Sequence, residues 1–455
     1  MFTKNTLKWV GIALVQAIFL QPVMAEDAAG DSNPKDTGVV TIGAQIRPRF
    51  EYRHGFKQPF SDTLKAAGFV EQRSRIWFDY KNSKFRIHLN LQDVRMWGST
   101  GQIYKGDPSM FNAYEAYGEY YLNKNWGFKV GRQAIDYDNA RFFGNLDWAA
   151  QGRSHDAFVI KYQNAANKLK VHGGFAFNQF QSEPRYLSFS QYLPNNYKMM
   201  GYVWAHKDWD KLSASLLFNN DGREKIADSS VVSSQTIGLI PTYKSDKWKI
   251  GAEMYYQMGK NISDQDISAY FVALNFTYKT DLTPITIGVD YASGTAHDAD
   301  AKDNNSWNPL YGTNHKFYGF MDYFYVGNAH GQNGRNTGLI DIYGKANFKL
   351  GKTNKHSLLT FVHYFMSPVE LLDLTDAAGT RTVDSGLGTE IDLVYKVVLT
   401  KGVSANVGYS QMFATDSMKQ IKRMADPANG LAKTGTNNWM WLQINFATDL
   451  LSIKK

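Results

Sequence analysis

The sequence of 455 residues contains no cysteine. This absence excludes a disulfide framework and metal sites built on thiolates. Beyond residue 25 there is also no apolar run long enough for a membrane-spanning helix, which needs about 20 apolar residues. If this chain enters a membrane, it must therefore do so with strands.

Sequence signatures of common enzyme sites are lacking as well. The chain has no Gly-x-Ser-x-Gly, His-Glu-x-x-His or phosphate-binding glycine loop, and its ten histidines show no metal-ligand spacing. Asp298, Asp300 and Asp303 form a weak candidate for a calcium loop, which lacks the glycine and the distal glutamate of the helix-loop-helix motif. We therefore expect no enzyme activity, no cofactor and no resident metal, and a solvated acidic loop at these aspartates.

The chain opens with the features of a cleavable export signal. Lys4 and Lys8 precede an apolar run of twelve residues, and residues 23–25 (Val-Met-Ala) form a small-residue cleavage site. We expect residues 1–25 to be a signal peptide that is removed on export. Residues 26–38 are polar and aperiodic, and we expect a flexible periplasmic segment there.

The charge of the exported chain is modestly basic. Without the two lysines of the signal, 48 Lys and Arg stand against 42 Asp and Glu, a net charge of +6. Such an excess suits an anionic solute and contact with lipopolysaccharide and outer-membrane lipid. We expect no nucleic-acid partner.

Residues 39–455 divide into about eighteen segments in which polar and apolar residues alternate, from residues 39–54 to residues 436–449. Eight short connections of three or four residues alternate with nine outer connections that are mostly long. An even strand number, short periplasmic turns and long extracellular loops are typical of a bacterial outer-membrane barrel. We predict an all-β fold, a transmembrane antiparallel β-barrel of about eighteen strands in the bacterial outer membrane.

Alternation also assigns side chains to faces. In residues 39–54 the apolar set must face lipid, because a lysine or arginine on the lipid face near the midplane costs about 2–4 kcal/mol. This places Arg47 and Arg49 in the lumen, next to Arg73 and Arg75 on the neighbouring strand. Two interpretations remain open: the arginines select anionic solutes, or they pair with internal carboxylates and fill the barrel.

Other features have less certain places. The segment 355–366 alternates poorly, so its register is weakly predicted. Aromatic residues near strand ends, including Trp439 and Trp441, are candidates for the interfacial girdles. In the loop at residues 135–153, several charged residues either fold the loop inward as a constriction or stabilise the loop itself.

Six segments together resemble a known family; they are 69–80 (FVEQRSRIWFDY), 92–98 (QDVRMWG), 113–121 (AYEAYGEYY), 129–158 (KVGRQAIDYDNARFFGNLDWAAQGRSHDAF), 314–328 (NHKFYGFMDYFYVGN) and 387–396 (LGTEIDLVYK). They are similar to the alginate export family of outer-membrane barrels. The resemblance implies a monomeric barrel of eighteen strands that passively exports an anionic uronate polysaccharide through an arginine-lined pore.

The expected solute path follows from both arguments. The resemblance implies path residues at Arg73, Arg75, Arg95, Glu115, Arg132, Arg141, Asp147 and Arg153. Alternation adds the lumen positions Arg47, Arg49, Lys129, Lys345, Glu390 and Asp392. In this mechanism cationic side chains replace water around passing carboxylates, and several weak sites in series keep any one of them from trapping the solute.

We therefore expect a passive outer-membrane channel for an anionic polysaccharide or its oligomers. The alternatives are a general or anion-selective porin for small nutrients and a surface adhesin or structural barrel. Outer loops that leave a wide pore would favour the polymer, and a lid over a narrow lumen would favour small solutes. A lumen blocked by paired charges would favour the adhesin.

Overall fold

The computed structural model describes residues 37–62, 64–101, 110–178, 196–225, 228, 230–324, 330–351, 353 and 355–454. The predicted signal peptide and nearly all of the predicted periplasmic segment lie outside these residues. A compact unit, Gly38–Lys455, contains all the strands.

Eighteen long strands build this unit. Their bounds are β1 (Val39–His54), β2 (Ala67–Lys81), β3 (Phe85–Met96), β4 (Met110–Tyr121), β5 (Trp126–Gln133), β6 (His155–Asn164), β7 (Leu169–Phe177), β8 (Met199–Asp208), β9 (Leu212–Glu224), β10 (Val231–Lys244), β11 (Trp248–Lys260), β12 (Asp266–Lys279), β13 (Pro284–Ala292), β17 (Leu339–Leu350), β18 (His356–Met366), β21 (Gly386–Thr400), β22 (Val403–Ala414) and β25 (Asn437–Lys454). The predicted fold class and strand number are confirmed.

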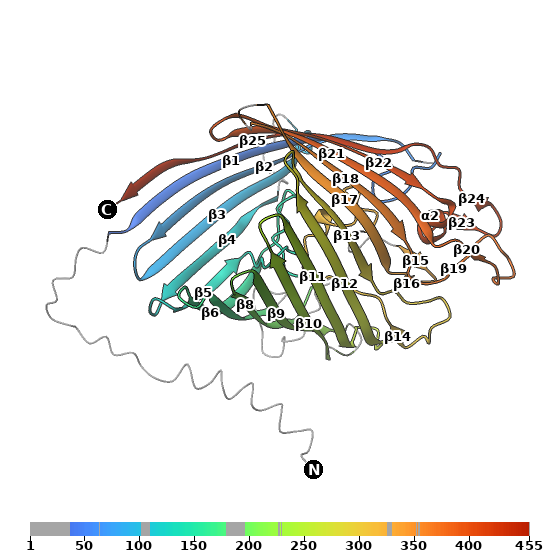
Figure 1. Cartoon of the computed structure of the whole chain (residues 1–455), viewed down its shortest axis with the longest axis horizontal. Helices are drawn as coiled ribbons and strands as arrows, with labels where there is room; N and C mark the ends of the chain where they lie inside the picture. Colours follow the sequence, from blue (N-terminus) through green and yellow to red (C-terminus); the bar gives the residue numbers. More distant parts are fainter. Residues whose placement is uncertain are drawn as a thin grey trace, which may run out of the picture. The chain divides into compact units, whose positions relative to one another are not determined.

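Each strand pairs antiparallel with its neighbours along the chain, and β1 pairs with both β2 and β25. The first and last strands lie side by side in Figure 1. This pairing, the seam of the barrel, leaves no sheet edge, which matters because an unpaired edge in lipid leaves backbone groups unsatisfied. At the seam Glu51 lies opposite Trp441, and Arg53 lies opposite Trp439.

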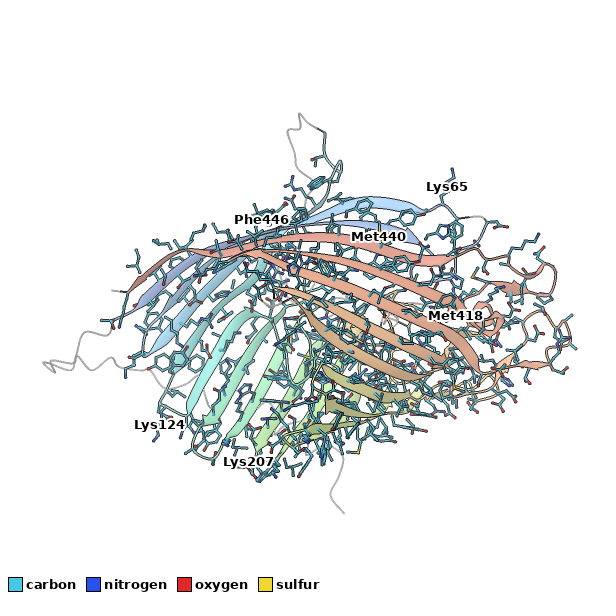
Figure 2. The ribbon with its side chains drawn as sticks, turned by 45° about the horizontal axis from the view of Figure 1, so that its top comes forward. Lys65, Lys124, Lys207, Met418, Met440 and Phe446 are labelled. Carbon is cyan, nitrogen blue, oxygen red and sulfur yellow. The ribbon has the colours of Figure 1, made fainter. Side chains whose placement is uncertain are left out.

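Side chains alternate between lipid and lumen as predicted. Ile46 is 50% exposed on the outer face, whereas its neighbour Arg47 is 6% exposed. Met440 and Phe446 project from the outer face of β25 in Figure 2 and are 42% and 49% exposed. The weakly predicted strand β18 follows the same rule, with His363 buried inside and Val362 exposed outside.

Some of the girdle candidates face the lumen instead, Trp439 and Trp441 among them. Trp439 and Trp441 are buried in the lumen, at 0% and 4% exposure. Their inward parity on β25 decides this, since Met440 and Leu442 take the outward positions. Trp126 and Tyr243 are exposed, as expected for interfacial positions.

The remaining elements are short and belong to the connections. They are β14 (Asp303–Asn304), η1 (Asn314–Lys316), β15 (Gly331–Gln332), β16 (Arg335–Asn336), β19 (Leu371–Leu372), β20 (Thr382–Val383), α2 (Asp416–Ile421), β23 (Ala425–Asp426) and β24 (Gly430–Leu431). Within the described residues no helix has the length and apolarity to cross a membrane.

The two ends of the barrel differ. Lys124 and Lys207 mark the short-turn end in Figure 2, and Lys65 and Met418 mark the long-loop end. In bacterial outer-membrane barrels the long loops face the cell exterior. Two connections at this end dominate the lumen: loop 3 (residues 134–154) and loop 7 (residues 293–338).

Candidate functional site: the lumen and its two inward loops

Loop 3 is held on one side of the lumen by the arginine wall, which consists of Arg47 and Arg49 on β1 and Arg73 and Arg75 on β2. Arg73 Nη1 donates to Asp147 Oδ1 at 2.8 Å, and Arg75 Nη1 donates to the same oxygen at 3.2 Å. Arg47 donates to the backbone oxygen of Asp147 at 2.7 Å. The four arginines predicted as neighbours are therefore close together, and they bind a loop of the same chain.

The electrostatics of Asp147 reflect this setting. Burial alone would raise the pKa of its carboxyl, but Arg73, Arg47 and Arg75 outweigh that effect and hold the pKa below its ordinary value. The Asp147 side chain keeps 50% exposure, whereas the side chain of Arg73 keeps 1%. The carboxylate is thus a solvent-accessible counter-ion on an otherwise buried cationic cluster.

Trp148, the next residue, reaches the seam. Arg49 Nη1 donates to the Trp148 backbone oxygen at 2.7 Å, and the Arg49 guanidinium lies 4.2 Å from the indole centroid. The same indole contacts Trp441 and Trp439 on β25, with centroid distances of 4.8 Å and 5.8 Å. One loop side chain therefore touches both strands that close the barrel.

On the other side of the lumen, loop 3 meets an acidic wall, which consists of Glu253 on β11, Asp290 on β13, Asp341 on β17, and Glu390 and Asp392 on β21. Arg141 Nη2 lies 2.8 Å from Asp290 Oδ2, and Arg141 Nε lies 3.3 Å from Glu253 Oε2. Burial acts to lower the pKa of Arg141, but Asp290 and Glu253 raise it well above its ordinary value. Arg141 is 2% exposed, so this ion pair is buried.

A third set of contacts fixes the start of loop 3 against β7 to β9. The Tyr137 hydroxyl lies 3.0 Å from both His172 Nδ1 and the Tyr202 hydroxyl. Trp204 Nε1 donates to Asp138 Oδ2 at 3.0 Å. Burial raises the pKa of Asp138 even though its hydrogen bonds act in the opposite direction. Loop 3 is thus attached to opposite sides of the barrel.

Loop 7 packs onto loop 3 inside the mouth. Phe143 and Tyr311 form a parallel bridge, and their rings stack with centroids 5.7 Å apart. Leu146 N donates to Thr313 Oγ1 at 3.1 Å, and Thr313 N donates to the Ala140 oxygen at 2.9 Å. The two loops therefore form one inward layer.

The acidic wall also binds loop 7 directly. Met321 N donates to Glu390 Oε1 at 2.7 Å, and Phe320 N donates to Asp392 Oδ2 at 3.3 Å. Gly319 adopts a φ of +80°, and a Cβ there would lie 2.6 Å from the Glu390 carboxylate. A glycine is needed because the backbone approaches the carboxylate so closely. Glu390 and Asp392, predicted as path residues, are buried behind loop 7 at 0% exposure.

Two lysines that point into the lumen contact aromatic rings instead of carboxylates. Lys129 Nζ lies 3.7 Å from the Tyr117 ring centroid, and Lys345 Nζ lies 5.3 Å from that of Phe361. Neither forms an ion pair with any described residue. By contrast, Glu119 accepts from Lys161 at 2.7 Å, and Asp79 accepts from Arg86 at 2.7 Å.

Lys316 of loop 7 is a further cation, and it lies in the inward layer. Its Nζ donates to the Asn139 oxygen at 2.9 Å and keeps an exposed side chain. Burial lowers its pKa, Asp136 opposes this effect, and Arg141 adds to it.

The remaining predicted path residues have varied places. Glu115 Oε1 accepts from Ala134 N at 3.0 Å, at the start of loop 3. Arg153 donates to the backbone oxygens of Tyr311 and Gly312, so it joins loop 3 to loop 7.

Two predicted path arginines lie on the outward parity of their strands. Arg95 of β3 lies opposite Gln72, which is on the outward parity of β2, so Arg95 is on the outward parity as well. It binds Asp93 at 2.6 Å. Arg132 pairs with Asp156 at 3.0 Å, and both are on outward parity at the rim. Strand alternation decides this: the inward positions on these strands belong to neighbours such as Gln92 and Gln133, each 2% exposed.

The weak calcium candidate finds no support. In the described part of the chain, no three or more His, Asp or Glu side chains are grouped to hold a metal ion. Asp300 instead accepts from the backbone of Lys302, and Asp303 belongs to β14, beside β12.

Several residues of the site were missed by sequence reasoning. They are Glu253, one of the partners of Arg141, together with Trp148 and Lys316. A signal existed for Glu253, since it lies inward next to an outward apolar residue, Met254, which is 39% exposed. No such alternation operates in loops, so Trp148 and Lys316 carried no sequence signal.

A closed antiparallel barrel of this size, with a lipid-facing apolar surface, a charged lumen and inward loops, defines a channel of the bacterial outer membrane. The family model described as "Alginate export" matches residues 38–428, and the chain belongs to that family.

Solved structures similar to the chain come from Pseudomonas aeruginosa. OccK9 (OpdG) and OpdQ are each 11% identical, with TM-scores of 0.58, over 90% of this chain and 98% of theirs. OccK8 (OprE) is 9% identical, with a TM-score of 0.57 over the same shares. At these identities the likeness shows the fold alone. No curated protein sequence matches the chain.

Proposed function

We propose that a single chain forms a passive, anion-preferring channel for acidic saccharides of oligomer size or smaller. The observation that carries this proposal is the imbalance of the lumen charges that water can reach, since Glu390 and Asp392, for which no lysine or arginine partner is seen among the described residues, are buried at 0% exposure. Lys129 and Lys345 have no ion-pair partner among the described residues, whereas the carboxylates Asp79 and Glu119 are paired. A lumen with uncompensated cations attracts anions and excludes cations.

The inward layer argues for a small solute. Loop 3 is attached to the arginine wall at Asp147 and to the acidic wall at Arg141, so it crosses the lumen. A solute must pass beside this loop, whereas a thick polymer would require the loop to leave its place. Membership of the alginate export family supports a uronate-type solute.

A second candidate is a porin for small carboxylates. One structurally similar protein, OpdK of Pseudomonas aeruginosa, has been solved with vanillate. Vanillate carries one carboxylate on an aromatic ring, and the same lumen cations would attract it. This candidate differs from the first in that sugar units play no part.

Ion selectivity of the purified barrel in a planar bilayer tests the proposal. In a KCl gradient the reversal potential should show preference for chloride. Trigalacturonate should block the current in a concentration-dependent way, and maltotriose should not. Block by vanillate without block by trigalacturonate would favour the second candidate, and a cation-selective current would refute both.

Matched pairs of variants test whether Lys129 and Lys345 set the ion selectivity. Lys129→Gln combined with Lys345→Gln should lower the chloride-to-potassium permeability ratio several-fold. Lys84→Gln combined with Lys401→Gln removes the same charge from exposed turns and should leave the ratio unchanged. An equal effect of both pairs would mean that net charge, not the lumen lysines, sets selectivity.

A further inference from the structure

Three cavities follow one another at the long-loop end, between loop 7 and the barrel wall. Their volumes are ≈ 710, ≈ 190 and ≈ 250 Å³. The first and second share Arg223, Asn308 and Leu310 in their linings, and the second and third share Asn304, Ser306 and Asn308. Since consecutive cavities share walls, they form a row along residues 304–311 of loop 7. The row ends beside β14, at the end of β12 (Figure 1).

Each cavity has a cationic side chain in its lining. The first has Arg153, Arg223 and the rim residue Arg132 with its partner Asp156, the second has Arg223 and Lys260, and the third has Arg335. The lining also contains carboxylates, since Arg223 Nε binds Asp221 at 2.6 Å and Asp303 lines the third cavity. Arginine binds carboxylates through paired hydrogen bonds, so several cations in a row suit a ligand with several carboxylates.

Between the cations lie groups that suit hydroxyls. Asn304 and Ser306 line both the second and third cavities, and Asn308 lines all three. Asn308 fixes its backbone through Gln257, which donates to its oxygen at 2.7 Å and accepts from its nitrogen at 2.9 Å. Its side-chain Oδ1 accepts from Leu310 N at 3.0 Å, which holds the side chain at the junction of the cavities.

The largest cavity also contains an unsatisfied buried group. His155 Nδ1 lies 2.9 Å from the Tyr197 hydroxyl, and the two rings stack with centroids 5.8 Å apart. His155 Nε2 is buried and finds no hydrogen-bond partner among the described residues. A buried polar atom without a partner costs free energy, and a ligand hydroxyl in this cavity would supply the missing bond.

We propose that this row of cavities binds an acidic oligosaccharide, with successive sugar units in successive cavities. The carboxylates would bind Arg223 and Lys260, and the hydroxyls would bind Asn304, Ser306 and Asn308. A volume of several hundred Å³ is the usual range for sites of small organic ligands. This inference deepens the proposed function and rests on it, since it names a capture site at the mouth of the same channel.

The cation Lys260 is available to a ligand. It pairs with Asp266 at 2.6 Å, and the two side chains are 49% and 62% exposed. Exposed pairs of this kind contribute little to stability. Lys260 can therefore exchange its partner for a ligand carboxylate without disturbing the fold.

Calorimetric titration of the purified barrel in detergent tests the site. We expect trigalacturonate to bind at least tenfold more tightly than galacturonate, because only the longer chain fills more than one cavity. Maltotriose, which has the hydroxyls but no carboxylate, should bind at least tenfold more weakly than trigalacturonate. Equal binding of the three sugars would overturn the proposal.

Three variants locate the binding. Asn308→Phe fills the junction without changing charge and should abolish the advantage of trigalacturonate over galacturonate. Lys260→Gln should weaken trigalacturonate several-fold. Arg381→Gln removes an exposed, aspartate-paired arginine from another loop at the same end and should change nothing. Wild-type affinity in both Asn308→Phe and Lys260→Gln would refute the site.

The reversal potential separates this inference from the proposed function. If the channel prefers anions but the variants bind trigalacturonate normally, the capture site is wrong and the function stands. If trigalacturonate binds at the cavities but the current is cation-selective, the channel proposal fails and the binding site remains.

Discussion

The arginine wall and the acidic wall hold the same loop with opposite charges. On the arginine wall the barrel supplies the cations and loop 3 supplies Asp147; on the acidic wall the barrel supplies carboxylates and loop 3 supplies Arg141. The loop charge is 50% exposed in the first case and 2% exposed in the second. The two attachments therefore share their chemistry and differ in access to water.

This difference determines how each attachment responds to change. Asp147 is half-exposed, so water screens its ion pairs, although its partners Arg47, Arg73 and Arg75 are buried. A fully buried ion that loses its partner leaves an uncompensated charge in a low-dielectric site. Breaking the ion pairs of Arg141 should therefore cost more free energy of unfolding than breaking those of Asp147.

The largest effect is expected from Arg141→Met. Glu253 and Asp290 would lose their shared cation while remaining buried, at a cost of about 3–5 kcal/mol. We expect a lower midpoint in urea unfolding of the purified barrel and a larger single-channel conductance, because loop 3 would leave the lumen.

The matched control for that variant removes all three charges. Arg141→Met with Glu253→Gln and Asp290→Asn should recover much of the lost stability, since replacing a whole buried ion cluster is often neutral. If the single and triple variants unfold at the same midpoint, unpaired buried charge is not the cause.

A smaller effect is expected from Asp147→Asn. Arg47, Arg73 and Arg75 are buried and would lose their carboxylate, but water reaches this half-exposed position and the amide oxygen of an asparagine can still accept from Arg73, so we expect a smaller cost than for Arg141→Met. The backbone oxygens of Asp147 and Trp148 still accept from Arg47 and Arg49, which keeps loop 3 in place. Bilayer recordings should show a higher chloride-to-potassium permeability ratio, because the arginines lose a counter-ion. A stability loss as large as that of Arg141→Met would contradict the comparison.

The smallest effect is expected from lowering the pH. Because the arginines hold the pKa of Asp147 below its ordinary value, its contribution to stability is present above about pH 3.9 and is lost as pH falls through the lowered pKa. The stability difference between wild type and Asp147→Asn should be constant near neutral pH and vanish in acid. A difference that does not shrink as the pH is lowered would mean that Asp147 acts by its shape and not by its charge.

The fold was largely predictable because lipid imposes a period of two on every strand. The predicted bounds of β1, residues 39–54, agree with the structure at both ends. The alternation also predicted that the four arginines of β1 and β2 lie together on the lumen face. Arg95 and Arg132 came from the family resemblance instead, and strand register places both on the outward parity.

The partners across the lumen were not predictable. Arg47 and Asp147 are 100 residues apart, and Arg141 and Glu253 are 112 apart. Alternation says which way a strand residue points, but it gives no position for a loop residue inside the barrel. Whether the arginines select solutes or bind internal carboxylates therefore remained open in the sequence. The structure shows that they pair with carboxylates of the same chain: Arg49 binds Glu51 and Glu71, and the other three bind Asp147 of loop 3.

The position of Trp148 has a consequence for assembly. Pairing of β1 with β25 joins segments about 400 residues apart, so closure is the slowest contact for the chain to find. Loop 3 lies between these strands in sequence, and its indole contacts both of them only after they have met. Docking of Trp148 therefore does not change the rate at which β1 and β25 pair. It slows the reopening of a barrel that has already closed.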